Sequence, residues 1–285
     1  MGEDLIEKKL LPSRIIVPLD GSKLAELALP YAEEIGERTG SDIVLLSVVE
    51  FVDEKYQSYL EKIADITKRH AEKYKIVPGS KQVEIYTITR EGNPAEVIID
   101  VAGKWGSSLI VMATHGRSGI GRWALGSVAD KVVRAAVNSP IMLIRGKKAR
   151  SDIKQKRLLK KALIPLDGSK PGELIIPYII QMAKNLDLEL TLFHVLRENN
   201  YDQTYAGSYL QNQCEEIKEQ GQTADYLLKI GSPAEEIIDL ADDLAVDFIA
   251  MATRGKNGFT PWTIGSVAQK VLLGGNTPLL LVRHE

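Results

Sequence analysis

Short apolar runs alternate with longer amphipathic segments along the whole chain. Residues 14–17 (Arg-Ile-Ile-Val) are rich in β-branched side chains, and residues 22–39 carry apolar side chains at helical spacing. Such a run predicts a buried strand, and such spacing predicts a helix packed against it. The alternation continues with predicted strands at 43–49, 83–89, 109–112 and 140–145, and with predicted helices at 54–76, from 94 onward and at 127–136.

A second copy of this pattern follows the first. Residues 18–23 (Pro-Leu-Asp-Gly-Ser-Lys) recur unchanged at 165–170, and residues 92–100 recur with small changes at 231–239. Two units of about 140 residues match the size of independent domains. The sequence predicts a first domain at 1–146, a basic linker at 147–161 and a second domain at 162–285.

Each copy is predicted to have an α/β fold. Strands alternate with helices, and several strands are apolar throughout, as in parallel sheets covered on both faces. We therefore expect two tandem doubly wound domains, each a five-stranded parallel sheet with helices on both faces. Ligands of such domains bind beyond the carboxyl ends of the strands.

Two prolines and two polar residues predict local details of the helices. Pro30 lies inside the 22–39 segment and predicts a kink, because proline removes a backbone hydrogen bond; Pro177 repeats it. Asn93 is the predicted N-cap of the next helix, ahead of Pro94 and with Glu96 as its capping-box partner. The second copy repeats this arrangement with Ser232, Pro233 and Glu235.

Composition narrows the class of protein. A hydrophobic content of 44% and a charged content of 26% are typical of folded globular chains, and a net charge of −2 offers no basic field for nucleic acid. The single cysteine, Cys214, excludes an internal disulfide and suits a reducing compartment. No apolar run approaches the ~18 residues that cross a bilayer, and the first residues lack the apolar core of a signal peptide. We expect a cytoplasmic protein without a nucleic-acid or membrane partner.

A glycine-rich loop joins a strand to a helix in each copy. The loops are residues 113–127 (ATHGRSGIGRWALGS) and 252–266 (ATRGKNGFTPWTIGS). Free backbone N–H groups and a helix N-terminus at one point suit an anion such as a phosphate. Neither loop matches a P-loop or a dinucleotide fingerprint. Each carries two cations with no acid beside them, namely Arg117 and Arg122, or Arg254 and Lys256.

Structural interpretations of the same residues stay open. Ser127 with Asp130, and Ser266 with Gln269, also match an ordinary helix N-cap with its capping partner. Asp20 can equally cap the turn into the first helix. No catalytic set and no metal-ligand set is predicted, because the histidines show no ligand spacing and no second carboxylate lies near Asp20 in sequence.

The spacing in both loops is alanine, two residues, glycine, nine residues and Gly-Ser. It resembles the ATP-binding signature of the universal stress protein family, Gly-x-x-Gly, nine residues, Gly-Ser/Thr, with alanine in place of the first glycine. The resemblance extends to the first strand with its Pro-Leu-Asp-Gly-Ser, to the Thr-His-Gly-Arg-Ser-Gly of the first loop and to the Pro-Ile-Met-Leu-Ile strand. It covers essentially the whole chain, which resembles a tandem universal stress protein.

The resemblance implies one adenine nucleotide in each copy, ATP or a relative, with or without Mg²⁺. It implies that Asp20 and Asp167 contact the adenosine and that Val48 and Val195 offer backbone groups to the adenine. The residues implied around the phosphates are Ala113, Gly116, Gly126, Ser127 and Val128 in the first copy, and Ala252, Gly255, Gly265, Ser266 and Val267 in the second. Proximity alone adds Arg117 and Lys256 as cations beside the phosphates.

Three classes of function follow. The leading one is an ATP-binding regulatory protein of a stress response, acting on an unknown protein partner without robust catalysis. The alternatives are a slow ATP hydrolase or adenylating enzyme of related architecture, and an adaptor that does not bind nucleotide. The resemblance also implies pairing through the last strand of each copy, so we expect an intramolecular pseudo-dimer of the two domains, with or without further homo-oligomerisation.

Overall fold

The computed structural model describes residues 12–73, 83–105, 108–114, 125–137, 139–145, 157–197, 203–253 and 264–283. The chain divides into two compact units, Met1–Leu158 and Leu159–Glu285. This boundary falls inside the segment expected to link the two copies.

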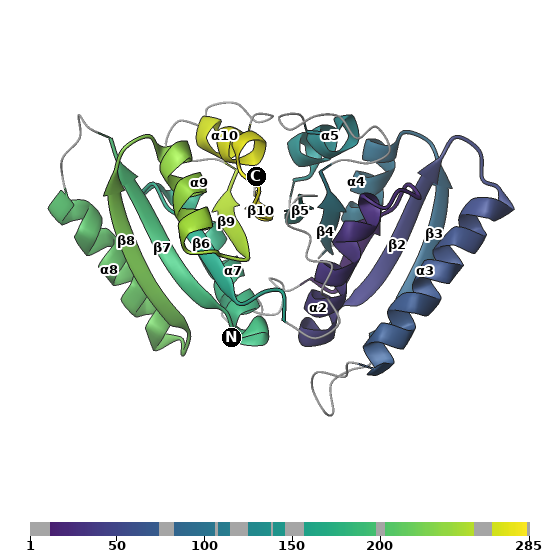
Figure 1. Ribbon diagram of the computed structural model, residues 1–285, viewed down its shortest axis with the longest axis horizontal. Coiled ribbons are helices and arrows are strands. Elements are labelled where there is room, and N and C mark those ends of the chain that lie inside the picture. Colours follow the sequence, from purple (N-terminus) through teal and green to yellow (C-terminus); the bar gives the residue numbers. More distant parts are fainter. Residues whose placement is uncertain are drawn as a thin grey trace. The chain divides into compact units, whose positions relative to one another are not determined.

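The first unit contains a parallel sheet in the order β3-β2-β1-β4-β5 (Figure 1). Its strands are β1 (Arg14–Pro18), β2 (Asp42–Val49), β3 (Ile85–Glu91), β4 (Ser108–Ala113) and β5 (Ile141–Ile144). Its helices are the 3-10 helix η1 (Ala25–Ala28), α2 (Leu29–Thr39), α3 (Glu54–Lys73), α4 (Pro94–Lys104) and α5 (Ser127–Ala135).

The second unit repeats the parallel order as β8-β7-β6-β9-β10. Its strands are β6 (Lys161–Pro165), β7 (Glu189–Leu196), β8 (Thr223–Ile230), β9 (Phe248–Ala252) and β10 (Leu279–Val282). Its helices are α6 (Lys170–Glu173), α7 (Ile175–Leu186), α8 (Gln203–Glu219), α9 (Pro233–Asp243) and α10 (Ser266–Gly274).

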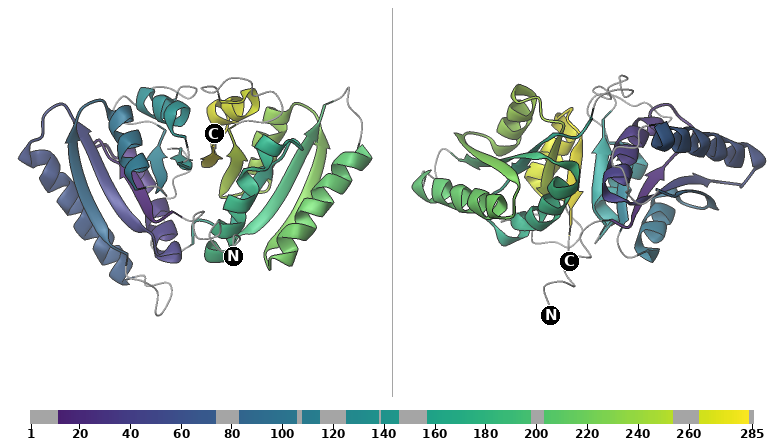
Figure 2. Two further views of the ribbon diagram at one scale, coloured as in Figure 1. Left: turned by 180° about the vertical axis from the view of Figure 1, so that it is seen from behind. Right: turned by 90° about the horizontal axis from the view of Figure 1, so that it is seen from below.

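Each sheet lies between two layers of helices, as the views in Figure 2 show for each unit. In the first unit α2 packs against α3, and α4 packs against α5. The central strands are buried on both faces, which explains why Ile15, Ile16 and Val17 are apolar without alternation. The predicted α/β fold with two doubly wound parallel sheets is therefore confirmed.

The segment at 22–39 is not the single kinked helix that the sequence predicts. A 3-10 turn, η1, ends at Ala28, and α2 begins at Leu29 with Pro30 in its first turn. Proline is tolerated there because the first N–H groups of a helix have no intrahelical partner. In the second unit α6 and α7 are likewise separate, and Pro177 lies in the first turn of α7. The prolines begin helices here and do not kink them.

Two further boundaries differ from the prediction. The third strand lies two residues later than 83–89, because β3 pairs along its length with β2 and runs to Glu91. Asn93 caps α4 as predicted, with its side chain accepting a hydrogen bond from the Ala95 N–H at 3.1 Å. Ser232 occupies the N-cap position of α9, but its side chain makes no capping hydrogen bond.

Candidate functional site

The site lies where the order of strands reverses. β1 and β4 are neighbours, yet the chain leaves β1 toward β2 and leaves β4 toward β5. This is the point at which doubly wound sheets bind ligands. The described site residues lie near the carboxyl ends of β1, β2 and β4 and at the start of α5, and at the equivalent ends of β6, β7 and β9 and the start of α10. They are Asp20, Val48, Ala113, Gly126, Ser127 and Val128, and in the second unit Asp167, Val195, Ala252, Gly265, Ser266 and Val267.

Other predicted site residues fall in the middle of the two glycine loops. Gly116 and Arg117 in the first loop, and Gly255 and Lys256 in the second, lie outside the described residues.

The described ends of each glycine loop are joined by a backbone hydrogen bond. The Gly126 N–H donates to the Thr114 carbonyl at 2.8 Å, and the Gly265 N–H donates to the Thr253 carbonyl at 2.6 Å. The start of α5 is therefore held against the end of β4, and the start of α10 against the end of β9. Because the loops leave and return at one point, the helix N-termini are fixed at the switch point.

The capping interpretation of Ser127 and Ser266 is wrong. Gly126 and Gly265 are the N-caps, the serines are the first helical residues, and neither helix start has a side-chain capping bond. Asp130, the expected partner of Ser127, instead binds Arg134 at 2.9 Å. Both serines are exposed. The first-turn N–H groups of α5 and α10 are thus left without a side-chain cap and favour an anion.

The backbone conformation of Gly126 and Gly265 does not require glycine. Their angles are φ −59°, ψ 145° and φ −56°, ψ 146°, an extended conformation that any residue adopts. A conformational requirement therefore does not explain why both copies have glycine here. The absence of a side chain instead leaves room for another group to approach the backbone closely.

The two aspartates after the first strands do form turns. Asp20 Oδ1 accepts from the Ser22 N–H at 2.9 Å, and Asp167 Oδ1 accepts from the Ser169 N–H at 3.0 Å. A Cβ at Gly172 would lie 2.7 Å from Asp167 Oδ1, so this glycine makes room for the carboxylate. The turn-capping role is therefore present, and it holds each carboxylate at the switch point.

Backbone groups of Val48 lie beyond the pairing of β2 with β1. On the β1 side of β2 the Leu46 carbonyl accepts from the Leu19 N–H at 2.8 Å. Backbone groups alternate in direction along a strand, so the N–H and C=O of Val48, two residues after Leu46, also face the β1 side. On that side they make no hydrogen bond to a described residue. The Phe193 carbonyl makes the equivalent bond at 2.8 Å, which leaves Val195 in the same position.

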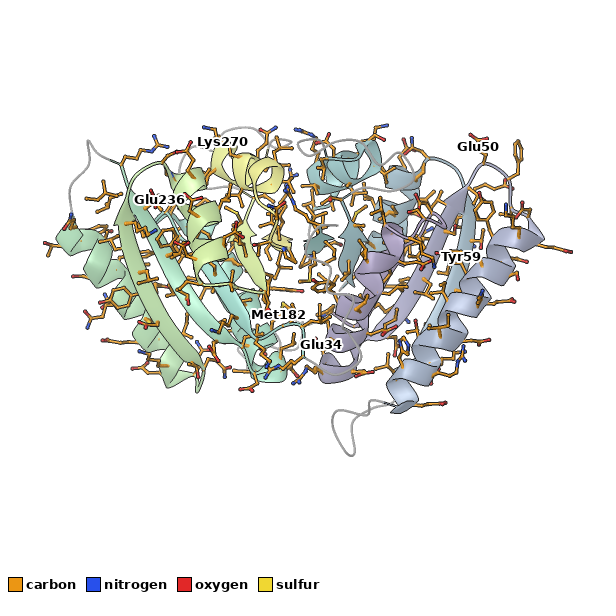
Figure 3. All side chains as sticks on the ribbon, in the orientation of Figure 1. Glu34, Glu50, Tyr59, Met182, Glu236 and Lys270 are labelled. Carbon is orange, nitrogen blue, oxygen red and sulfur yellow. The ribbon has the colours of Figure 1, made fainter. Side chains whose placement is uncertain are left out.

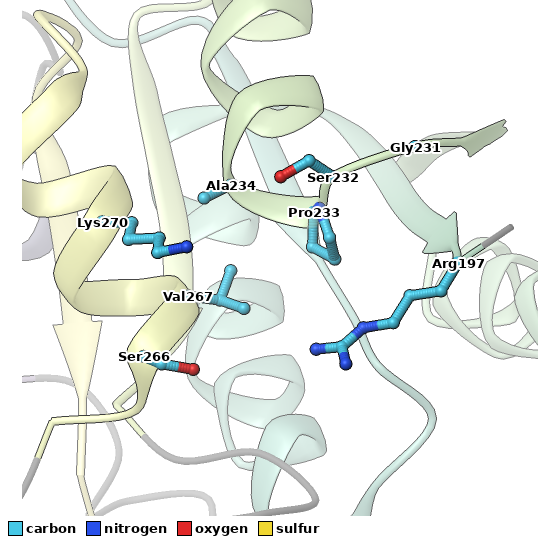
Figure 4. A pocket seen from close by; sticks show the side chains of 8 residues that line it. All are labelled: Arg197, Gly231, Ser232, Pro233, Ala234, Ser266, Val267 and Lys270. Atoms are coloured by element: carbon cyan, nitrogen blue, oxygen red, sulfur yellow. The ribbon is translucent and has the colours of Figure 1, made fainter. Parts of the chain in front are cut away.

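A pocket of about 350 Å³ lies beside these residues in the second unit (Figure 4). It is formed by the end of β7, the turn from β8 into α9, and the start of α10. Of the predicted residues, Ser266 and Val267 line it, whereas Asp167, Val195, Ala252 and Gly265 do not. The remaining lining residues are Arg197, Gly231, Ser232, Pro233, Ala234 and Lys270.

Sequence reasoning interpreted the Gly-Ser-Pro at 231–233 only as a helix start. The same Gly-x-Pro pattern recurs at 92–94 as Gly-Asn-Pro, directly after a strand, and was a signal that the turn belongs to the carboxyl-end edge. Arg197 directly follows β7 and carried the same signal.

Within the part of the chain that the structure describes, no three His, Cys, Asp or Glu residues lie together as a metal site would require. None of the helices searched there is long and apolar enough to cross a membrane.

The model of the universal stress protein family matches residues 12–145 and 159–283. A universal stress protein of Methanocaldococcus jannaschii, MJ0531, is 31% identical over 151 residues, covering 50% of this chain and 85% of that protein. The Synechocystis universal stress protein Slr1230 is 21% identical and covers 94% of this chain and 99% of its own.

Among solved structures, a universal stress protein from Archaeoglobus fulgidus has a TM-score of 0.68 at 19% identity. It covers 96% of this chain and 98% of its own. The two matched segments together span most of the sequence, so this chain belongs to the universal stress protein family.

Proposed function

We propose that each unit binds an adenine nucleotide, with ATP as the first candidate, and that the protein is a nucleotide-responsive regulator without robust catalysis. The observation that carries this proposal is the start of α5 and of α10. In both, the N-cap is a glycine although its backbone angles would suit any residue. Neither helix start has a side-chain cap, and the serine that follows the glycine is exposed. This arrangement suits a phosphate, and the choice of adenine rests on the resemblance of the glycine loops to the family signature.

The other site residues suit the remaining parts of a nucleotide. The backbone groups of Val48 and Val195 offer one donor and one acceptor to a base edge. The carboxylates of Asp20 and Asp167 would accept hydrogen bonds from ribose hydroxyls. Mg²⁺ would bind together with the nucleotide phosphates. ATP affinities measured with and without Mg²⁺ test that role.

Calorimetry with ATP tests the proposal on the whole chain. We expect Gly126→Val to abolish binding in the first unit and Gly265→Val to abolish it in the second, because a side chain blocks close approach to the backbone. The fold should survive, since valine tolerates the observed backbone angles. Gly103→Val in α4 is the matched control, because a Cβ there meets no atom within 4 Å.

If ATP affinity is unchanged in a folded Gly126→Val, Gly265→Val double variant, the phosphate assignment is wrong. The alternative of an adaptor that does not bind nucleotide is tested by mass spectrometry of small molecules released from the native protein. That alternative predicts that no nucleotide co-purifies. For the regulator, we expect phosphate release slower than about 1 s⁻¹, the lower end of ordinary enzymes.

A further inference from the structure

The pocket of the second unit has the size of a ligand site and a strongly cationic lining. Its volume of about 350 Å³ lies in the range of about 300–1,000 Å³ usual for small-molecule sites. Arg197 and Lys270 enter it from opposite sides (Figure 4). No carboxylate is among the described residues that line it. Neither cation has a hydrogen bond or ion pair with any residue that the structure describes, so both charges are available to an anion.

Uncapped backbone donors add to these two charges. The pocket lies at the N-termini of α9 and α10, and neither the Ser232 nor the Gly265 position provides a side-chain cap. Glu236 in the first turn of α9 is engaged by Lys229 at 3.3 Å. Thr253, whose carbonyl accepts from the Gly265 N–H, is 4% exposed and its hydroxyl has no partner among the described residues, but it does not line the pocket. The donors at the pocket are therefore the N–H groups of the two helix starts.

The first unit differs from the second at these positions. The strand register places Leu46 opposite Pro18 and Phe193 opposite Pro165. Counting on from these pairs, Glu50 of the first unit corresponds to Arg197 of the second. Figure 3 shows Glu50 just beyond β2 and Lys270 on α10. A carboxylate therefore stands where the pocket has a guanidinium.

Two more differences point the same way. Glu91 in the first unit corresponds to Ile230 in the second, by their pairing with Val49 and Leu196. The N-terminus of α4 is already capped by the Asn93 side chain, whereas that of α9 has no such cap. The first unit therefore has Glu50, Glu91 and the side-chain cap of α4 at these positions. The second unit has Arg197, and α9 has no side-chain cap.

We propose that this pocket is a polyphosphate subsite of the second unit alone, occupied by the phosphate chain of a nucleotide or by free polyphosphate. Arg197 and Lys270 bind the oxygens from two sides, and the N–H groups of α9 and α10 donate to them. The duplicated units therefore differ in ligand preference. Both units bind a nucleotide, but the second binds di- and triphosphates more tightly than the first, where Glu50 and Glu91 weaken the binding of a long phosphate chain. This inference rests on the proposed phosphate site at the start of α10, and adds Arg197, Lys270 and the start of α9 to it.

Calorimetry with sodium tripolyphosphate on the full chain tests the subsite without adenine. We expect one site per chain and a loss of about tenfold or more in affinity for Arg197→Glu, the effect of at least one charge-assisted hydrogen bond. Lys218→Glu is the matched control with the same change of charge. It lies in the last turn of α8, near the start of β8 and so at the opposite end of the strands from the pocket. It should bind as the wild type does.

No binding, two equal sites, or an unchanged affinity in Arg197→Glu would each overturn the subsite. Titration with ATP and with adenosine separates the two proposals. Arg197→Glu should weaken ATP in the second unit and leave adenosine unaffected. If tripolyphosphate binds as expected while neither ATP nor adenosine binds, the subsite stands for free polyphosphate and the proposed nucleotide function fails.

Discussion

Individual residues on α2 show how burial changes the chemistry of acids in this protein. Glu34 is 8% exposed, and its carboxylate accepts a hydrogen bond from the Leu158 N–H at 2.6 Å. Glu33 Oε2 lies 3.1 Å from His70 Nδ1. Burial, followed by the negative charges of Glu33 and Glu34, raises the pKa of Glu37 to about 7. The opposing effect of Arg38 is smaller.

The raised pKa of Glu37 predicts a pH-dependent stability. Its folded-state pKa exceeds the ordinary value of 4.5, so its neutral form stabilises the fold below pH 4.5 and this contribution is lost as the pH rises through about 7. Glu37→Gln removes that loss. We expect the variant to exceed the wild type by about 1 kcal/mol in free energy of unfolding at pH 8, after allowance for partial exposure, and to match it near pH 4.

Urea unfolding at several pH values measures this difference. A gap that does not change between pH 4 and pH 8 would contradict the assignment. Glu54→Gln, at an exposed position of the surface helix α3, is a control with the same change of charge.

At the scale of elements, the same helix start is built in two ways. α4 and α9 both follow a Gly-x-Pro turn, yet only α4 has a side chain hydrogen-bonded to its first turn. The acceptor is Asn93 Oδ1, which reaches the Ala95 N–H at 3.1 Å. The first-turn N–H groups of α9 have no side-chain cap, and this helix start lines the pocket.

This difference predicts unequal effects of two matching substitutions. Asn93→Ala should lower the free energy of unfolding by about 1 kcal/mol, the usual value of an N-cap. Ser232→Ala should change it by less than about 0.5 kcal/mol, because no capping bond is lost. Thermal unfolding of both variants measures the two effects, and equal losses would show that Ser232 caps α9 in solution.

At the scale of the whole molecule, each unit ends its sheet with a short apolar strand. Within the first unit β5 pairs with β4 through carbonyls such as those of Pro140 and Ile144. By alternation the Leu143 N–H faces the other edge, which needs a covering partner. We propose that β5 and β10 cover one another in an intramolecular pseudo-dimer, as the family resemblance implies.

A chain that ends at residue 146 tests this pairing. It should dimerise in solution through the uncovered edge of β5, and light scattering measures its mass. In the same fragment, Leu143→Pro removes an edge donor and should give a monomer, because proline is tolerated on an edge strand. A fragment that stays monomeric at high concentration without the proline would refute the pairing.

The sequence alone determined the fold class, the duplication and the approximate place of the site. Periodicity reports which side chains are buried, and the carboxyl-end rule then assigns the Pro-Leu-Asp-Gly-Ser turns and the glycine loops to one edge. These properties depend on local sequence patterns or on the repeat, so they can be predicted without knowledge of contacts between distant residues. The helix start at Pro94 was predicted for the same reason.

Only the tertiary structure decided which donors and charges are available at that edge. Gly126, not Ser127, is the N-cap of α5, because its carbonyl accepts from the Asp130 N–H while its own N–H bonds to Thr114 across a loop. Arg197, directly after β7, and Lys270 of α10 line one pocket together with the turn from β8 into α9. A single sequence carries no record of such pairings, since hydrogen-bond partners far apart in the chain are set by the packing of whole elements.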